Sequence, residues 1–177
     1  MVSNATREYT SVLQLTNEEF PGVDGQRVRK EQLGVKWKRV INGENLTLQD
    51  TLVFQNFGLE AVTFEATLDF EAGFEDVFIV RGFMRPNRAQ ATSTWLKDRL
   101  TFSYEGEDKR TRNLSIRFTP EPSGQEGTQA KYTISLEPQG SKELIVTFRI
   151  RETDGLEHFP ETSVLHPGEP SRKWLTH

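Results

Sequence analysis

Cysteine is absent from this chain of 177 residues, which excludes disulfides, thiolate catalysis and metal sites built on cysteine. The sequence also lacks an apolar run of about 18 residues, the length that a transmembrane helix needs. Residues 1–6 lack the apolar core of a secretory signal peptide. No long basic run stands out among the 22 basic and 26 acidic residues, so we expect neither nucleic acid nor a membrane as a partner. These absences fit a cytoplasmic protein.

Motifs for catalysis or cofactor binding are missing as well. The three histidines, His158, His166 and His177, lie near the C-terminus, and none has a second ligand at metal-binding spacing. The sequence has no phosphate-binding or dinucleotide-binding glycine pattern and no serine in a nucleophile elbow. We therefore predict no catalytic residue, no cofactor and no metal. Carboxylates are abundant, and counting them neither supports nor excludes the Glu/Asp pair of a glycosidase.

Apolar residues recur at every second position in about eight segments that turn residues separate, which is the pattern of half-buried strands. The segments are residues 6–15, 35–41, 46–54, 62–70, 100–104, 114–118, 132–136 and 144–150. Asn42-Gly43 predicts a hairpin because both residues tolerate positive φ. The predicted fold is all-β, an antiparallel β-sandwich of about eight or more strands, with a closed barrel as the alternative.

Alternation stops near residue 152, and four turn-forming residues follow: Pro160, Pro167, Gly168 and Pro170. We therefore predict a sandwich domain at residues 1–152 and a tail or linker at residues 153–177. A chain of this length buries roughly 70% of its unfolded surface, so it can support its own core.

Residues 69–83 depart from the strand pattern. Gly73 permits a bend, and Phe74, Val77 and Phe78 have the spacing of a single helical turn, predicted near 74–79. A basic loop follows. Such departures from a simple pattern are where function or an interface is expected. The simplest interpretation is an acidic surface turn.

Tryptophans are the candidate sugar platforms, because a flat apolar ring with a polar edge stacks on saccharides. Trp37 alternates with lysines on a predicted strand, which favours a place in the core. Trp95 lies in a polar stretch, and we weigh it evenly between closing the sandwich edge and forming a binding surface. A calcium site at Asp69, Glu71 and Asp76 is a minor alternative, since the regular spacing of oxygen ligands is missing.

Several motifs resemble one known family. They are Asp69-Phe-x-Ala-x-Phe74-x-Asp-Val-Phe-x-Val-Arg81-Gly with Arg85-Pro86, then Leu52-Val-Phe-Gln-Asn-Phe-Gly58, Leu100-x-Phe-x-Tyr-x-Gly-x-Asp108, Arg110-Thr-Arg112 and Leu114-x-Ile-x-Phe118. Together, over about residues 35–152, they resemble the N-terminal domain of bacterial glycogen debranching enzymes of the amylo-alpha-1,6-glucosidase type. The resemblance implies a β-sandwich that precedes a catalytic (α/α)-barrel, which carries the catalytic carboxylates.

The same resemblance implies a role for residues 69–86. Asp76, Phe78, Arg81 and Arg85 match the motif and become candidates for contact with the barrel or with a glucan, and Trp95 is added as an exposed aromatic candidate. We hypothesise that Asp76 pairs with Arg81 and presents Phe78 and Arg85. The alternative is that the motif only stabilises a corner of the fold.

Two functions follow. The first is a non-catalytic accessory domain of an α-glucan-processing glycosidase, which packs against the barrel and shapes the mouth of its active site. The second is a stand-alone β-sandwich that binds carbohydrate or protein. The chain alone is not predicted to be an enzyme. An unoccupied docking face should show as an exposed apolar patch.

Overall fold

A computed structural model of the chain describes residues 8–23, 25–74, 91–106 and 109–153. Twelve strands form in that part of the chain, and no helix does. The strands are β1 (Glu8–Thr16), β2 (Phe20–Pro21), β3 (Arg27–Val28), β4 (Leu33–Asn42), β5 (Thr47–Asn56), β6 (Val62–Asp69), β7 (Thr92–Leu96), β8 (Arg99–Glu105), β9 (Thr111–Thr119), β10 (Gly124–Glu126), β11 (Gln129–Leu136) and β12 (Ser141–Thr153). The predicted all-β class is confirmed.

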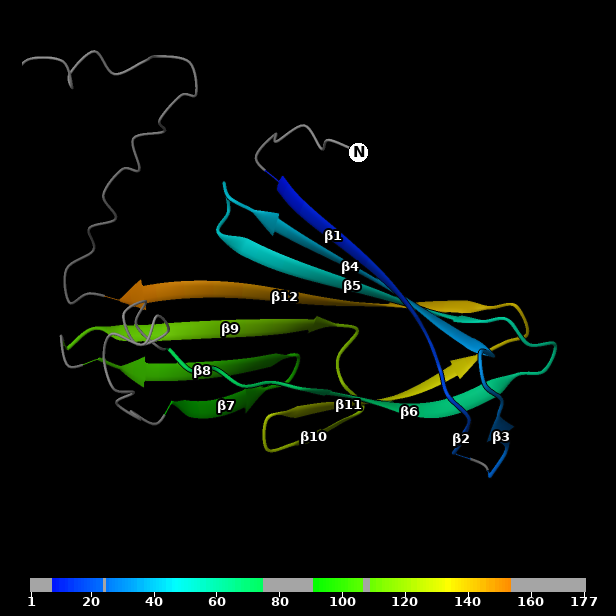
Figure 1. Cartoon of the computed structure of the whole chain (residues 1–177). Helices are drawn as coiled ribbons and strands as arrows, with labels where there is room; N and C mark the ends of the chain where they lie inside the picture. The colour runs from blue at the N-terminus through cyan, green and yellow to red at the C-terminus, as the bar shows by residue number, and fades with distance from the viewer. Residues whose placement is uncertain (1–7, 24, 75–90, 107–108, 154–177) are drawn as a thin grey trace, which may run out of the picture.

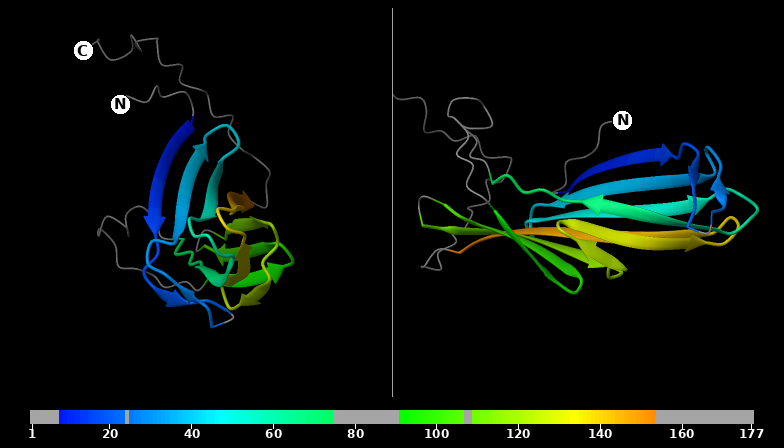
Figure 2. Two further views of the ribbon diagram at one scale, coloured as in Figure 1. Left: turned by 90° about the vertical axis from the view of Figure 1, so that its right-hand side faces the viewer. Right: turned by 90° about the horizontal axis from the view of Figure 1, so that it is seen from below.

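Two antiparallel sheets of unequal width face each other (Figures 1 and 2). The large sheet has seven strands in the order β1-β4-β5-β12-β9-β8-β7, and the small sheet has three in the order β10-β11-β6. A short β2-β3 ribbon forms a third, two-stranded sheet. The predicted sandwich is therefore confirmed, although its two layers differ by four strands.

The core lies between the sheets and is set by the alternation of the strands. On β6 and β11 the even-numbered positions are the buried ones, among them Phe64 and Ile134, because successive side chains of a strand point to opposite faces. Phe64 lies 5.9 Å from Phe54 of β5, measured between ring centroids. Phe118 of β9 is 1% exposed. Aromatic pairs thus join the two sheets along the core.

Four short or polar strands differ from the prediction. Strands β2, β3, β7 and β10 lie outside the eight segments that the sequence predicted as strands. They are too short or too polar to show alternation. The predicted helical turn near 74–79 lies outside the described residues except for Phe74, which has a φ of +47°.

The β4–β5 hairpin forms, but by a different turn from the one predicted. The left-handed residue is Leu46, with a φ of +49°, and neither Asn42 nor Gly43 has a positive φ. Instead, the Asn42 side-chain oxygen accepts hydrogen bonds from the backbone N–H of Glu44 (2.9 Å) and of Asn45 (3.1 Å). The predicted hairpin is confirmed, but its turn does not use the tolerance of these two residues for positive φ, because Asn42 stabilises the turn through its side chain.

Asn56 organises one end of the sandwich. Its fully buried side chain donates to the carbonyls of Glu60 (2.8 Å) and Glu137 (3.1 Å) and accepts from the N–H of Gly58 (2.9 Å). One amide therefore ties the turn after β5 to the turn before β12, and every polar atom of that side chain has a partner, as a buried amide requires.

We predict that Asn56→Ala lowers the free energy of unfolding by about 2–4 kcal/mol, because it leaves buried backbone groups without partners. Urea denaturation of the two proteins measures the difference. The control is Asn45→Ala in the exposed hairpin turn, which should change stability by less than about 0.5 kcal/mol. Equal effects of the two substitutions would contradict the role assigned to Asn56.

Candidate functional site

The end of β6 opens the motif singled out in the sequence. The Asp69 carboxylate accepts hydrogen bonds from Thr128 (3.1 Å), from the Gln129 amide (3.2 Å) and from the backbone N–H of Phe70 (2.9 Å). These bonds, led by that of Gln129, lower the pKa of Asp69. Asp69 therefore fastens the end of β6 to the turn before β11.

Aromatic side chains anchor the chain as it leaves β6. The ring of Phe70 packs edge-on against Phe118 (5.3 Å between centroids) and near Phe148 (6.1 Å). Phe74 stacks on Tyr104 of β8 at 5.5 Å. A bulky residue rarely adopts the positive φ of Phe74, and such a backbone is kept where surrounding contacts hold it. The motif thus starts from a fixed base at the β8–β9 end of the sandwich.

Four of the five predicted site residues, Asp76, Phe78, Arg81 and Arg85, lie outside the described residues, as does Asp76 of the alternative calcium site. Their roles stay predictions. Asp69 and Glu71 are described, and no group of three or more metal-binding side chains occurs in the described part of the chain. The three histidines, His158, His166 and His177, also lie outside the described part of the chain.

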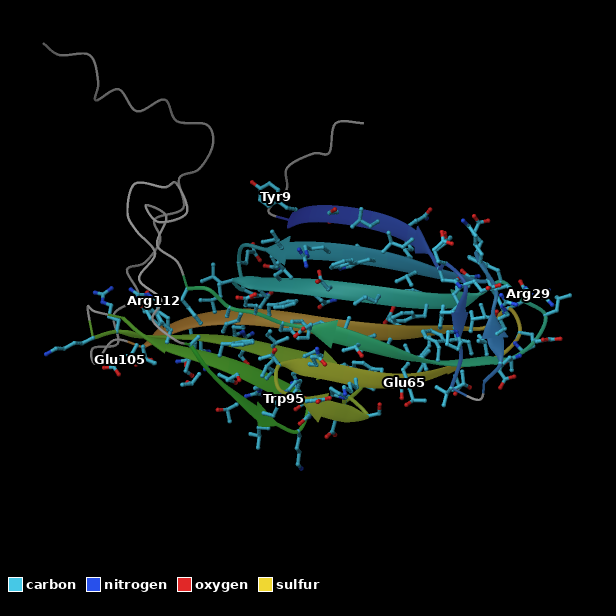
Figure 3. The ribbon with its side chains drawn as sticks, turned by 60° about the horizontal axis from the view of Figure 1, so that its bottom comes forward. Tyr9, Arg29, Glu65, Trp95, Glu105 and Arg112 are labelled. Carbon is cyan, nitrogen blue, oxygen red and sulfur yellow. The ribbon has the colours of Figure 1, made fainter. Side chains whose placement is uncertain are left out.

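Trp95, the fifth predicted residue, lies on β7 at an edge of the large sheet (Figure 3). Its ring stacks on Phe118 at 5.4 Å, and its indole N–H donates to the carbonyl of Gly127 at 2.9 Å. Gln125 of β10 donates to the carbonyl of Lys97 at 2.6 Å. These contacts close the β7–β10 edge of the sandwich. Trp95 is half-buried by these contacts, and a role in binding a sugar stays a prediction.

A cleft of about 880 Å³ lies between residues 19–32 and 57–60, at the end of the sandwich opposite the β8–β9 turn. Arg29 marks this end in Figure 3, far from Glu105 and Arg112. Arg27 and Lys30 line the cleft and pair with Glu19 and Glu18 respectively. The cleft therefore combines charged groups with apolar ones, and the sequence analysis did not identify it as a site.

Phe57 supplies the aromatic surface of that cleft. Its ring lies so close to Gly34 that an added Cβ there would be 2.6 Å from the ring, so Gly34 permits this packing. Phe57 remains 49% exposed, and Leu59 beside it is 85% exposed. The Asn56-Phe57-Gly58 motif was the available sequence signal, because it marked a turn with an aromatic residue at its centre.

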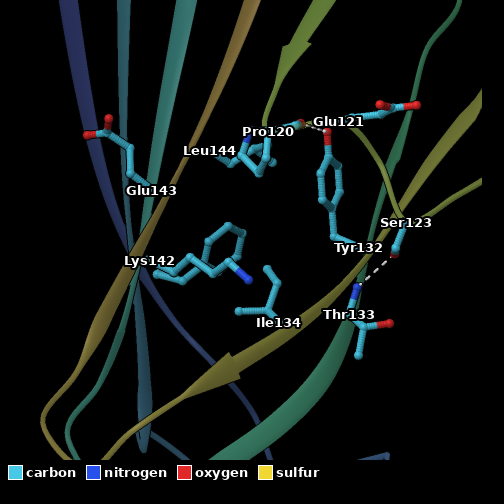
Figure 4. Close-up of a pocket in the computed structure, with 10 residues that line it drawn as sticks. Pro120, Glu121, Ser123, Tyr132, Thr133, Ile134, Lys142, Glu143 and Leu144 are labelled. Atoms are coloured by element: carbon cyan, nitrogen blue, oxygen red, sulfur yellow. Dashed lines mark hydrogen bonds between the residues drawn. The ribbon is translucent and has the colours of Figure 1, made fainter. Parts of the chain in front are cut away.

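A smaller cavity of about 240 Å³ opens between β11 and β12 (Figure 4). The Tyr132 hydroxyl points to the carbonyl of Pro120 at 3.3 Å, and burial raises the pKa of Tyr132. Glu121 and Glu143 line the cavity, but Figure 4 shows both carboxylates pointing away from it on opposite sides. The cavity is therefore a gap between the two sheets, and it does not hold the pair of facing carboxylates that glycoside hydrolysis requires.

Comparisons with known proteins agree with the fold. Residues 1–147 match the sequence model of one protein family, which is described as the N-terminal domain of (some) glycogen debranching enzymes. The chain belongs to this family. A search of the curated proteins finds no match. Among the described residues, no helix is long and apolar enough to cross a membrane.

One solved structure with the same fold is named "Putative kojibiose phosphorylase from human microbiome". The TM-score is 0.53 and the sequence identity is 11%. The match covers 82% of the present chain and 18% of the phosphorylase chain. The chain therefore spans less than a fifth of that protein, and at this identity the likeness concerns the fold.

We predict that Trp95→Ala lowers the free energy of unfolding by about 2–4 kcal/mol, because it removes the ring that packs on Phe118. Trp95→Phe should retain part of this packing and lose less. Thermal or urea unfolding measures both. Unchanged stability of Trp95→Ala would show that the ring does not close this edge and would favour a binding role.

Proposed function

We propose that this chain is the non-catalytic N-terminal domain of an α-glucan-processing glycosidase of the debranching type. In this proposal it packs against a catalytic (α/α)-barrel and shapes the mouth of the barrel's active site. The observation that carries the proposal is the family match, which extends over residues 1–147. The parent enzyme would then be a glycoside hydrolase, and its catalytic carboxylates would belong to the barrel.

The base of the motif supports a contact role for the residues that follow it. Asp69, Phe70 and Phe74 are each fixed by contacts to other strands. A segment that starts from a fixed base can present side chains with less loss of conformational freedom on binding. We therefore propose that Arg81 and Arg85, with Asp76 and Phe78, contact the barrel or the glucan near the active site.

In the full-length enzyme, we predict that Arg81→Ala lowers kcat/KM on a branched α-glucan about tenfold, which equals about 1.4 kcal/mol of lost transition-state stabilisation. The matched control is Arg88→Ala, an arginine of the same basic loop outside the family motif, which should leave kcat/KM unchanged. Steady-state kinetics measures both. Full activity of the Arg81 variant would support the interpretation of the motif as a corner of the fold.

A second candidate function, a stand-alone carbohydrate-binding module, is favoured by the cleft at Phe57. An exposed aromatic ring beside arginine, glutamine and carboxylate groups has the composition of a saccharide-binding surface. This function needs no second domain.

For the second function, isothermal titration of the chain with maltooligosaccharides should show binding that Phe57→Ala abolishes. The control is Phe20→Leu in the β2-β3 ribbon, which lies outside the cleft lining and should leave binding unchanged. Absence of heat with maltooligosaccharides and with glycogen would exclude this function and leave the accessory role.

A further inference from the structure

The small sheet leaves part of the large sheet's inner face uncovered. Phe64 meets Phe54 at one end, and Phe70 crosses to Phe118 and Phe148. The contacts thus run diagonally from β5 towards β9. In Figures 1 and 2, the parts of β1, β4 and β5 near the β4–β5 turn rise away from β6 and β11.

Strand pairing shows that this uncovered area belongs to the inner face. Tyr9 of β1 lies opposite Ile41 of β4, and Leu13 lies opposite Trp37. Trp37 lies in turn opposite Leu52, a core residue of β5. Directly paired residues of an antiparallel sheet share a face. These side chains therefore point to the core side of the sheet, although β1 lies at its edge.

The exposure of this area is unusual for the inner side of a sandwich. Tyr9 is 72% exposed, Leu13 is 51% exposed and Ile41 is 43% exposed. Ile150 of β12, two positions beyond Phe148 on the same face, is 67% exposed. We call the set Tyr9, Leu13, Ile41 and Ile150 the open face. Apolar side chains exposed in this way mark an interaction surface, although Ser11 and Arg39 lie between Ile41 and Leu13 on the same face and divide the apolar area.

The same edge of the sandwich is partly closed at its other end. The β2-β3 ribbon supplies Phe20, which packs on Phe64 at 6.1 Å, and the fully buried Val28. The backbone N–H of Val23 donates to the carbonyl of Thr63 on β6 at 3.0 Å. A short segment of the chain thus covers part of the inner face at this end, although Leu15 of β1 is still 50% exposed, and the open face lies at the end without such a segment.

An ion pair lies within the open face, because Arg39 and Asp50 are paired on that face between Ile41 and Trp37. Arg39 binds Asp50 through two hydrogen bonds of 2.7 Å, and its guanidinium carbon lies 5.2 Å from the centre of the Trp37 ring. Asp50 is 4% exposed, and the Asp50 hydrogen bond raises the pKa of Arg39. The two charges neutralise each other. The occupant of the open face therefore needs apolar side chains rather than a compensating charge.

We propose that residues 154–177 of this chain cover the open face. They follow Thr153, the last residue of β12, which lies three positions after Ile150. The segment carries six large apolar side chains: Leu156, Phe159, Val164, Leu165, Trp174 and Leu175. Twenty-four extended residues could reach about 80 Å, far more than the face requires. The covalent tether gives an effective concentration in the millimolar range, so modest apolar contacts suffice.

The test uses the full chain and a nitroxide label. Because the chain has no cysteine, Ser163→Cys, beside Val164 and Leu165, gives a single labelling site. The methyl signals of Leu13, Ile41 and Ile150 should lose most of their intensity in the oxidised state of the label and recover when it is reduced. Leu59 is the control, since it is exposed (85%) and follows β5 at the end of the sandwich remote from the β4–β5 turn. Its methyl signals should keep their intensity.

A second variant tests the apolar nature of the contact. Leu13→Asp should restore the Ile41 and Ile150 signals of the labelled chain, whereas Val12→Asp, on the opposite face of β1 and 49% exposed, should not. Equal intensities for Leu13 and Leu59 would overturn the proposal. Loss of intensity in unlabelled chains mixed with labelled ones would also overturn it, because the occupant would then be a second copy. Signals of the open face that change only when a separately produced catalytic domain is added would also overturn it and would assign the face to that domain.

Discussion

Burial of the inner face of the seven-stranded sheet is the constraint on which this structure depends. A sheet with one apolar face must cover that face, and the opposing sheet has three strands. Aromatic contacts from Phe64, Phe70 and Phe74 therefore extend the cover beyond the width of the small sheet. Trp95 and the β2-β3 ribbon close two of the remaining gaps. The open face is the part of the inner face that these elements leave uncovered.

The long strands could be predicted because their alternation is local. Residues 62–70 hold the same parity throughout, and a shift of one residue would move that whole set into water. The short strands could not be predicted in this way. β7 has three polar residues followed by Trp95 and Leu96, and Trp95 finds its partners, Phe118 and Gly127, 23 and 32 residues later in the chain. Such pairings depend on tertiary packing, which no local pattern encodes.

The candidate sites also differ in whether the local sequence could predict them. The motif at residues 69–86 was recognisable as a departure from alternation, and its described base is fixed by Asp69 and Phe74. The cleft at Phe57 depends on Asn56, whose side chain bonds to Glu137, 81 residues away. The open face depends on the difference in width between the sheets, because Leu13 alternates like any core residue and is left exposed by the shape of the fold.

The measurement that tests the central claim most directly is glucose release from a branched limit dextrin by the purified chain and by the full-length enzyme, at equal molar concentration. The account predicts release by the enzyme and none by the chain, because the proposed function assigns the catalytic carboxylates to another domain. Release by the chain, retained through a second purification and lost on a substitution within residues 8–153, would contradict it and would require an active site within the sandwich.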